Sequence, residues 1–291
     1  MKKAIVIPIV VVLVLLVASI MFVFMNKSPV GFDVTLKRGD VSVLTQNDGE
    51  WVKLTEQEIF FKELKSIRTD DGEAILTIKN SVIVTIQPNS LINIQDVLNE
   101  NEITIEQKSG SSWSKFVGVM GVTDYNVETA HTVASVRGTG FYTNTTDDYS
   151  VFMLGEGELD IKDWNETLQP FQKVIIYNNQ TIELQNLTPE EIEMLKQMMK
   201  EDLEKIRIVR QTIIDNNGVL VSSLKSLTDA SDEEIDKFLL DVDEGRINDR
   251  EMAEQSPISL PADSELVFDL NDEIKEQIAL INSLNQNGTQ G

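Results

Sequence analysis

The first hydrophobic feature of the chain is one long uncharged run near its N-terminus. Residues Ala4–Met25 carry no charge over 22 positions, enough to span about 30 Å of hydrocarbon as a helix. Lys2 and Lys3 precede the run, so the positive-inside rule predicts a cytoplasmic N-terminus. A cleaved signal peptide is the alternative, but its apolar region is usually about 7–15 residues and ends at a small-x-small site, which is missing here. We predict a single-pass membrane anchor over residues 1–26, with the bulk of the chain outside the cytoplasm.

After a short tether the chain alternates apolar and polar positions in short segments. The expected strands are Phe32–Leu36, Val41–Leu44, Glu50–Leu54, Ala74–Lys79, Ser81–Gln87, Leu91–Ile94, Glu102–Glu106, Tyr125–Tyr142, Tyr149–Leu154, Gly157–Ile161, Lys173–Tyr177 and Thr181–Leu184. Turn residues such as Asn47-Asp48-Gly49 separate them. Many short strands with no helical run between them predict an all-β sandwich, roll or short solenoid over residues 33–185.

The hydrophobic spacing becomes helical from Leu187 onward. Thr188-Pro-Glu-Glu191 predicts a helix start, with Thr188 as N-cap and Glu191 completing a capping box. Apolar residues then recur every three to four positions until the stop signal Asn216-Asn217-Gly218. Shorter helices are expected over Ser231–Leu240 and Asn271–Leu284, with a polar, irregular segment between them.

We expect this C-terminal region, residues 187–291, to be an acidic and loosely packed helical appendage whose last residues, Asn285–Gly291, are disordered. Met194, Met198 and Ile206 form a partial apolar stripe that would dock on the β domain or on a partner. Docking on the protein's own domain is the commoner outcome.

The net charge of the chain argues against some classes of binding partner. Its 25 basic and 48 acidic side chains give a formal net charge of -23, which repels nucleic acid phosphate and anionic lipid headgroups. We therefore expect no nucleic acid partner. The chain has no cysteine, which excludes disulfides, thiolate metal sites and a cysteine nucleophile.

The segment Tyr125–Tyr142 looks like the part around which the β domain is organised. One alternate set of its positions is small, namely Ala134, Val136, Gly138 and Gly140. The opposite set carries Arg137, because successive strand residues point to opposite faces. Glycines at alternate strand positions usually mark a bulge, a bend or a close backbone approach. The first interpretation is a structural hub that closes the fold, and the second is a recognition site.

This segment resembles the FecR domain family of extracytoplasmic domains in bacterial and archaeal membrane proteins. The similarity rests on Val127-Glu-Thr-Ala130 followed by Ala134-Ser-Val-Arg-Gly-Thr-Gly-Phe141. Flanking pieces are similar in order and spacing: Ile67-Arg-Thr69, Gly72, Ala74–Ile78, Asn89-Ser-Leu-Ile-Asn-Ile94 and Val151-Phe-Met-Leu-Gly155-Glu-Gly-Glu-Leu159. The resemblance covers Val34–Ile176, about half of the chain. It implies a sensing, scaffolding or binding domain outside the membrane.

The sequence departs from the family pattern in three places. Lys65-Ser66 stands where a Gly-Asp is usual, and Ala130 stands where a proline is usual. Family members that regulate iron signalling carry a cytoplasmic sigma-factor-binding domain before their membrane helix, whereas only three residues precede the run here. That activity is therefore not expected of this chain.

The family motif supplies the first candidate site residues. Arg137, Gly138, Thr139 and Phe141 are interpreted as structural, since a guanidinium in a small, apolar stretch needs internal hydrogen-bond acceptors. The alternative is that Arg137 is exposed and binds an anionic ligand or a partner's carboxylate.

Catalytic and metal-binding chemistry find little support in the sequence. His131 is the only histidine and is interpreted as a solvated or hydrogen-bonded strand residue. The acidic groups Asp70-Asp71, Asp147-Asp148 and Asp241-Val-Asp243-Glu244 are interpreted as solvated turns rather than calcium ligands. With no nucleophile–base motif or phosphate loop, we expect no enzyme activity, metal or cofactor.

Two further patterns suggest surface chemistry. Five Asn-x-Ser/Thr triplets are candidate glycosylation sites: Asn144, Asn165, Asn179, Asn186 and Asn287. Trp51, Trp113 and Trp164, with Phe60-Phe61, would form a sugar-stacking platform if they came together, although scattered tryptophans are more often core or strand-edge residues.

These observations predict a membrane-anchored, FecR-like protein that is a non-catalytic binding or scaffolding module in envelope signalling or surface assembly. We expect a protein partner. The alternative is a cell-surface carbohydrate or cell-wall binding protein.

Overall fold

The structure is a computed structural model that describes residues 31–46, 49–96, 101–118, 121–216, 231–255 and 264–287. From Phe32 onward the chain forms one compact unit. The predicted anchor over Ala4–Met25 lies outside the described residues. Within the described ranges, no helix combines the length and the apolar character needed to cross a bilayer.

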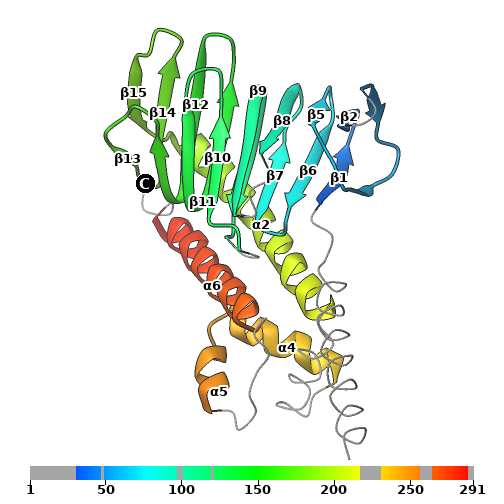
Figure 1. Ribbon diagram of the computed structural model, residues 1–291. Coiled ribbons are helices and arrows are strands. Elements are labelled where there is room, and N and C mark those ends of the chain that lie inside the picture. The colour runs from blue at the N-terminus through cyan, green and yellow to red at the C-terminus, as the bar shows by residue number, and fades with distance from the viewer. Residues whose placement is uncertain are drawn as a thin grey trace, which may run out of the picture. The chain divides into compact units, whose positions relative to one another are not determined.

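The described part is mainly β, as the alternating pattern predicts, with helices in its C-terminal third (Figure 1). The strands are β1 (Phe32–Arg38), β2 (Val41–Leu44), β3 (Trp51–Lys53), β4 (Glu58–Phe61), β5 (Ser66–Thr69), β6 (Glu73–Ile78), β7 (Val82–Ile86), β8 (Ser90–Asp96), β9 (Glu102–Phe116), β10 (Asp124–Glu128), β11 (Val133–Thr145), β12 (Tyr149–Ile161), β13 (Thr167–Leu168), β14 (Gln172–Tyr177) and β15 (Ile182–Asn186). The sequence analysis missed β4, β5 and β13, and the single strand expected over Tyr125–Tyr142 is two antiparallel strands, β10 and β11. It also predicted β9 too short and divided β12 into two strands.

The pairings arrange these strands in two layers that share three long strands. The first layer runs β4-β1-β6-β7-β9-β11-β12-β14-β15, and it uses the second half of β9 and β11 and the first half of β12. The second layer runs β3-β2-β5-β8-β9-β10-β11-β12-β13 through the other halves. Only β9 and β10 pair in parallel among the described strands. The fold is therefore a roll in which β9, β11 and β12 each pass from one layer to the other.

Glycines with a positive φ mark the place where each long strand changes layer. Gly110 in β9, Gly138 in β11 and Gly157 in β12 have φ values of 78°, 53° and 79°. A left-handed residue costs a glycine little, and it lets a strand bend sharply. The register of β11 against β12 shifts between Arg137 and Gly140, which is a bulge. The glycines of the motif therefore serve the bend, as expected.

The bulge corrects two details of the expected β11. Ala134 and Val136 are buried, but so is Phe141, although strict alternation would place it on the opposite face. The extra residue reverses the alternation, because a shift of one residue moves every later side chain to the other face. β11 is also a central strand with partners on both sides, so it does not close the fold at an edge.

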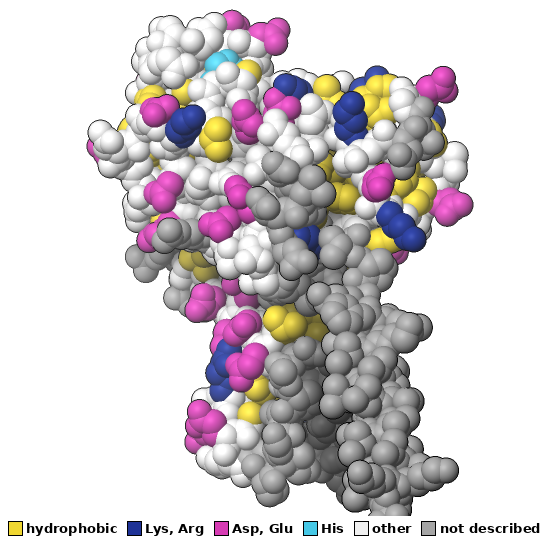
Figure 2. Space-filling model, viewed as in Figure 1, with side chains coloured by type: hydrophobic (Ala, Val, Ile, Leu, Met, Phe, Trp, Pro, Cys, Tyr) yellow, Lys and Arg dark blue, Asp and Glu magenta, His cyan; other side chains and the backbone are white. Residues whose placement is uncertain are grey.

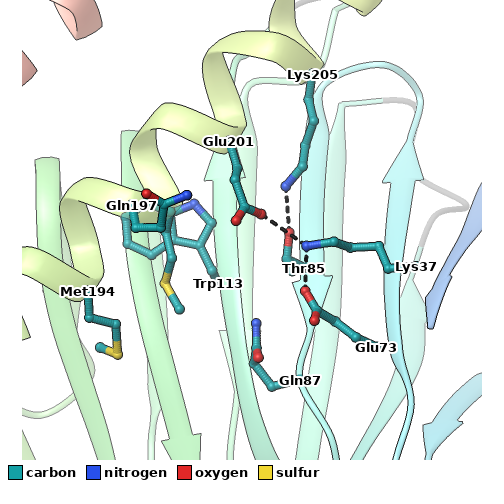
Figure 3. Close-up of a pocket in the computed structure, with 10 residues that line it drawn as sticks. Lys37, Glu73, Thr85, Gln87, Trp113, Met194, Gln197, Glu201 and Lys205 are labelled. Carbon is teal, nitrogen blue, oxygen red and sulfur yellow. Dashed lines mark hydrogen bonds and ion pairs between the residues drawn. The ribbon is translucent and has the colours of Figure 1, made fainter. Parts of the chain in front are cut away.

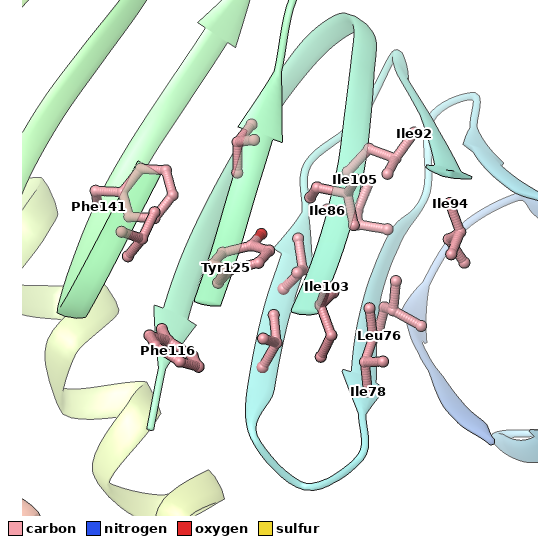
Figure 4. Close-up of a cluster of buried hydrophobic side chains, with 14 of the residues drawn as sticks. Leu76, Ile78, Ile86, Ile92, Ile94, Ile103, Ile105, Phe116, Tyr125 and Phe141 are labelled. Atoms are coloured by element: carbon pink, nitrogen blue, oxygen red, sulfur yellow. The ribbon is translucent and has the colours of Figure 1, made fainter. Parts of the chain in front are cut away.

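The space between the layers is filled by one large hydrophobic cluster (Figure 4). Phe116, Tyr125 and Phe141 are among its aromatic members, and Tyr125 contacts the other two with ring centroids about 6 Å apart. The Tyr125 hydroxyl is within 2.9 Å of Ser114 Oγ, so this buried polar atom is satisfied. The motif residue Phe141 is fully buried here, as its structural interpretation requires.

The helices are α2 (Pro189–Asn216), α4 (Asp232–Asp243), α5 (Asp249–Gln255) and α6 (Ser264–Asn287). The predicted start of α2 is confirmed, and the helix expected over Ser231–Leu240 is present as α4. α5 occupies a segment predicted to be irregular, and α6 starts seven residues earlier than predicted. It also continues to Asn287, which corrects the expected disorder of residues 285–287.

Replacing Thr188 by alanine should destabilise the protein by about 1 kcal/mol. The Thr188 amide donates to Glu191 Oε2 at 2.8 Å, and the Glu191 amide donates to Thr188 Oγ1 at 3.2 Å, so the capping box is formed. Chemical denaturation of the full chain would measure the loss. Thr181→Ala, an exposed threonine just before β15, is the control. An equal loss in both variants would contradict a capping role.

Helices α2 and α6 lie against the outer face of the first layer, and α4 packs against α6 (Figure 1). One cluster joins Ile83 of β7 to apolar residues of α2, α4 and α6. A second cluster joins Trp113 of β9 and Met153 of β12 to Leu195 and Met199 of α2 and to Ile281 of α6. The helices are thus well packed on the protein's own β layers, which corrects the expected loose appendage.

Candidate functional site

A buried group of charged side chains lies where α2 and α6 meet the first layer. Lys115 of β9 has no exposed side-chain surface, and its Nζ donates to Glu156 Oε1 of β12 at 2.5 Å. The same nitrogen donates to Glu273 of α6. Gln277, one turn further along α6, is also fully buried and places Nε2 3.5 Å from Glu156 Oε1. The side chains of β9, β12 and α6 therefore meet at one buried ammonium group.

Helix α2 joins this group through Trp113, two residues before Lys115 on the same face of β9. The indole Nε1 of Trp113 donates to Asp202 of α2, which is fully buried. Asp202 Oδ1 lies 3.5 Å from Lys205 Nζ, which also donates to Thr85 Oγ1 of β7 at 2.6 Å. We call Lys115, Glu156, Glu273, Asp202 and Lys205 the buried charge cluster.

Two glycines make room for these side chains. A Cβ on Gly140 would lie 2.8 Å from Glu156 Oε1 and 2.9 Å from Trp113 Cζ2, and one on Gly155 would lie 2.9 Å from Trp113 Cη2. A motif glycine of β11 therefore permits a close approach, as expected, but the bulge places Gly140 on the face opposite Ala134 and Val136, so the single small face expected from the sequence is wrong. What approaches Gly140 is the indole and the carboxylate, not a second backbone.

Burial and charge displace the pKa values inside the cluster in a consistent direction. Burial raises the pKa of the Glu156 carboxyl above 4.5, and the attraction of Lys115 does not offset it. Burial likewise raises the pKa of Asp202. For Lys115 burial alone would lower the pKa, but the carboxylates of Glu156 and Glu273 outweigh it, so the ammonium stays charged. The interior thus favours protons on the carboxyl groups and a charged Lys115.

A cavity of about 290 Å³ opens beside the cluster, between the first half of α2 and strands β1, β6, β7 and β9 (Figure 3). The Lys37 side chain extends across the cavity, and its Nζ donates to Glu73 Oε1 at 2.5 Å and to Glu201 Oε2 at 3.0 Å. Gln87 and Gln197 also line it, with Met194 and Met198 as its apolar wall. Most of the residues around the cavity are polar or charged, and several of them already pair with one another, so apolar atoms make up much of the surface that is left exposed inside it.

A second buried polar network holds the helices together. Arg210 of α2 donates to Asp243 of α4, at 2.5 Å from Nη1, and to Asn271 Oδ1 of α6 at 2.6 Å. Asn271 Nδ2 in turn donates to Asp249 Oδ2 of α5, and Lys275 donates to the other oxygen of that carboxylate. Asp243 was expected in a solvated turn, whereas it is buried against Arg210.

The structure places the other predicted site residues apart from the buried charge cluster. The backbone of Arg137 pairs with Glu158 in β12, but its side chain lies outside the described atoms, so both interpretations of this arginine stay predictions. Thr139 Oγ1 donates to the Glu158 carbonyl at 2.9 Å. His131 is buried in the turn between β10 and β11, with Nδ1 2.8 Å from Ser150 Oγ. It is hydrogen-bonded as expected, although it lies in a turn rather than a strand.

The acidic pairs do not form a shared site in the described chain. Asp71 Oδ1 accepts a hydrogen bond from the Asp40 amide at 3.0 Å, and Asp241 pairs with Arg246. No group of three or more acidic, histidine or cysteine side chains with metal-binding geometry occurs in the ranges that the structure covers.

The three tryptophans lie in three different environments, so the alternative of a sugar-stacking platform does not form, and the expectation of core or strand-edge residues is the one that holds. Trp113 is buried under α2, and Trp164 packs against the core between the layers. Trp51 of β3 is 37% exposed, and the guanidinium of Arg68 lies 4.7 Å from its ring centre. Phe60 of β4 is also exposed.

The five candidate glycosylation sites differ in exposure. Asn165, Asn179 and Asn186 are exposed, and Asn144 is half-buried within β11. The side chain of Asn287 lies outside the described atoms. Their modification stays a prediction.

The sequence analysis missed the buried charge cluster entirely. Lys115 falls in the half of β9 that was not predicted as a strand, so its position beside Trp113 on one face went unseen. A usable signal was the alternation Ser112, Trp113, Ser114, Lys115, Phe116, in which one charge stands on an apolar face. Glu156 belongs to the segment that resembles the FecR family, but nothing local distinguishes it from Glu158.

Comparisons with known proteins give little information about the family or the function of this chain. No family model matches it, and no curated protein does. Two solved structures, at 2.50 and 1.65 Å resolution, of a "putative anti-sigma factor" from Parabacteroides distasonis are similar at 16% identity, with TM-scores of 0.38 and 0.39. The matches cover 44% and 45% of this chain, which spans about three fifths of those chains, at 62% and 63%. A similarity at this level carries no inference about fold or function, and the FecR resemblance stays a prediction.

Proposed function

We propose that this chain is a membrane-anchored, extracytoplasmic, FecR-like protein that acts as a non-catalytic binding or scaffolding module in envelope signalling or surface assembly. The anchor rests on the uncharged run Ala4–Met25 behind Lys2 and Lys3. The FecR-like assignment rests on the motif around Arg137–Phe141. That motif occupies the central strand β11, consistent with a role in building the domain rather than in chemistry.

The proposal of a protein partner rests on the exposed edge strands: β4 ends the first layer, and β3 ends the second. β4 pairs only with β1 among the described strands, and β3 pairs only with β2. Trp51 and Val52 of β3 and Phe60 of β4 are exposed by 37%, 50% and 43%. Figure 2 shows yellow side chains among dark-blue ones on the side of the molecule that carries β1 to β5.

The opposite edge of the first layer gives a useful contrast. β15 has Leu184 as its exposed large hydrophobic residue, and Glu183 and Gln185 flank it. Charged and polar residues on an edge strand discourage pairing with other chains. Strands β3 and β4 also carry exposed charges, Lys53 and Glu58, but each of them presents an exposed aromatic ring, and aromatic residues are enriched in protein interfaces. We therefore propose that an extended, apolar segment of a partner protein adds to β4.

Photocrosslinking in intact membranes tests this proposal. A photoreactive residue at Phe60 of the full chain should capture a partner protein, and Trp51→Ala should reduce that capture about tenfold, as loss of an aromatic interface anchor does. The same photoreactive residue at Leu184 is the matched control on the other edge and should capture little. Equal capture at both positions, or capture of sister copies only at Phe60, would overturn the partner model.

A further inference from the structure

The buried charge cluster contains more acid than base. Glu156, Glu273 and Asp202 supply three carboxyl groups, whereas Lys115 and Lys205 supply two ammonium groups. Groups from every element packed against Glu156 contribute: Lys115 from β9, Glu273 and Gln277 from α6, and Asp202 with Lys205 from α2. If all three carboxyl groups are ionised, one negative charge remains uncompensated in a largely buried site. Such a charge is costly, and binding one proton removes the cost.

Gln277 supplies a separate geometric observation. Its side chain is fully buried, and Nε2 is directed at Glu156, yet Oε1 has no hydrogen-bond donor among the described groups. An unsatisfied buried acceptor costs about 1–3 kcal/mol. Because Nε2 now faces Glu156, a protonated carboxyl group on Glu156 would supply the missing O–H donor once the Gln277 amide turns over. The cluster is thus short of one proton both in charge and in hydrogen bonding.

We propose that the docking of α6 and α2 onto the first layer is proton-dependent, with Glu156 and its neighbours binding one proton when the helices are docked. The inference is independent of the β3–β4 partner site. Mild acid then tightens the contact between helices and strands, and higher pH loosens it. Loosening would expose the face of the first layer that carries Trp113 and Met153.

The direction of the pH dependence follows from linkage. The pKa of Glu156 is raised in the docked state relative to its ordinary value near 4.5. A group with a raised pKa contributes stability below its ordinary pKa, and that contribution is lost as the pH rises through the raised value. Asp202 has the same direction, so it adds to the effect. Lys115 is charged throughout and sets no part of the pH window.

Hydrogen exchange of the full chain in detergent micelles tests the proposal directly. From about pH 5 to about pH 8, protection factors of α6 and α2 amides should fall severalfold, while those of β-core amides such as the amides of β7 should change less. Protection factors remove the intrinsic effect of pH on exchange. An α6 protection that is the same at both pH values would overturn the proposal.

Glu156→Gln gives a second test, because the proposal expects this loss of a buried charge to increase the protection of α6. The amide keeps the shape of the carboxyl, loses the charge and can donate to Gln277 Oε1, while Lys115 keeps Glu273. Near pH 8 this variant should have α6 protection factors severalfold higher than those of the natural protein, and most of the pH dependence should be abolished. A plain structural ion pair predicts the reverse, a loss of protection. Glu276→Gln, an exposed residue of α6, is the control and should keep the natural pH profile.

If Glu276→Gln flattened the profile as well, the effect would come from general surface charge, and the proposal would fail. If Glu156→Gln did not fold, the profile of the natural protein would still decide.

Discussion

Lys115→Met is expected to destabilise the protein by about 3–5 kcal/mol near neutral pH, a large share of the stability of an ordinary domain. The Lys115 side chain has no exposed surface, and its Nζ is the shared partner of Glu156 and Glu273. Without Lys115, the carboxyl groups of Glu156 and Glu273 lie close together with no cation between them, and Glu156 is buried. Chemical denaturation of the full chain would measure the loss as a lower midpoint at an unchanged slope.

Lys108→Met is the matched control, because Lys108 lies on the same strand and also pairs with a glutamate. Its side chain is 48% exposed, so the pair with Glu106 contributes little. We expect a change within about 0.5 kcal/mol. Similar losses in the two variants would show that burial does not determine the role of Lys115.

Gly110→Ala is expected to cost about 3 kcal/mol or more, or to prevent folding. Gly110 has a φ of 78°, and an added Cβ would lie 2.3 Å from Ser90 Oγ and 2.4 Å from the carbonyl oxygen of Asn89. The second contact is with backbone, which cannot move aside cheaply. The bend of β9 between the two layers therefore depends on the lack of a side chain at this position.

Gly138→Ala separates backbone strain from steric collision. Gly138 also has a positive φ, 53°, but an added Cβ would meet nothing within 4 Å in the described structure. We expect a loss of about 1–2 kcal/mol from the left-handed backbone alone. Denaturation midpoints of the two variants would measure the difference, and a Gly110→Ala variant no less stable than Gly138→Ala would refute the collision argument.

Local features of the fold were predictable from local sequence. The start of α2 follows from Thr188, Pro189 and Glu191, because a capping box is made within one helical turn. Strand β7 was predicted from the alternation of Val82, Val84 and Ile86, which all face the core. The opposite face of β7 carries Ile83 and Thr85, and this face is also buried because the helices cover it.

The long strands were less predictable, because their bends break the alternation that identifies a strand. β12 reads as two strands on either side of Glu156, with Gly157 at the bend, and the second half of β9 was not recognised after Gly110. In both cases a glycine with positive φ moves the strand from one layer to the other. The alternation then restarts on a different face, and a periodicity of two cannot be followed across it.

The sequence by itself determined the elements: a β region, the helix that begins after Thr188, and a central segment whose glycines mark a bulge and a close approach. Only the tertiary structure decided how the elements share charge. Lys115 and Glu273 are 158 residues apart and meet because α6 lies over β9. The alternation around Lys115 marks it as a charge on an apolar face, but nothing local points to Glu273 as its partner, since the burial that gives their contact its energy exists only when the layers and helices have packed.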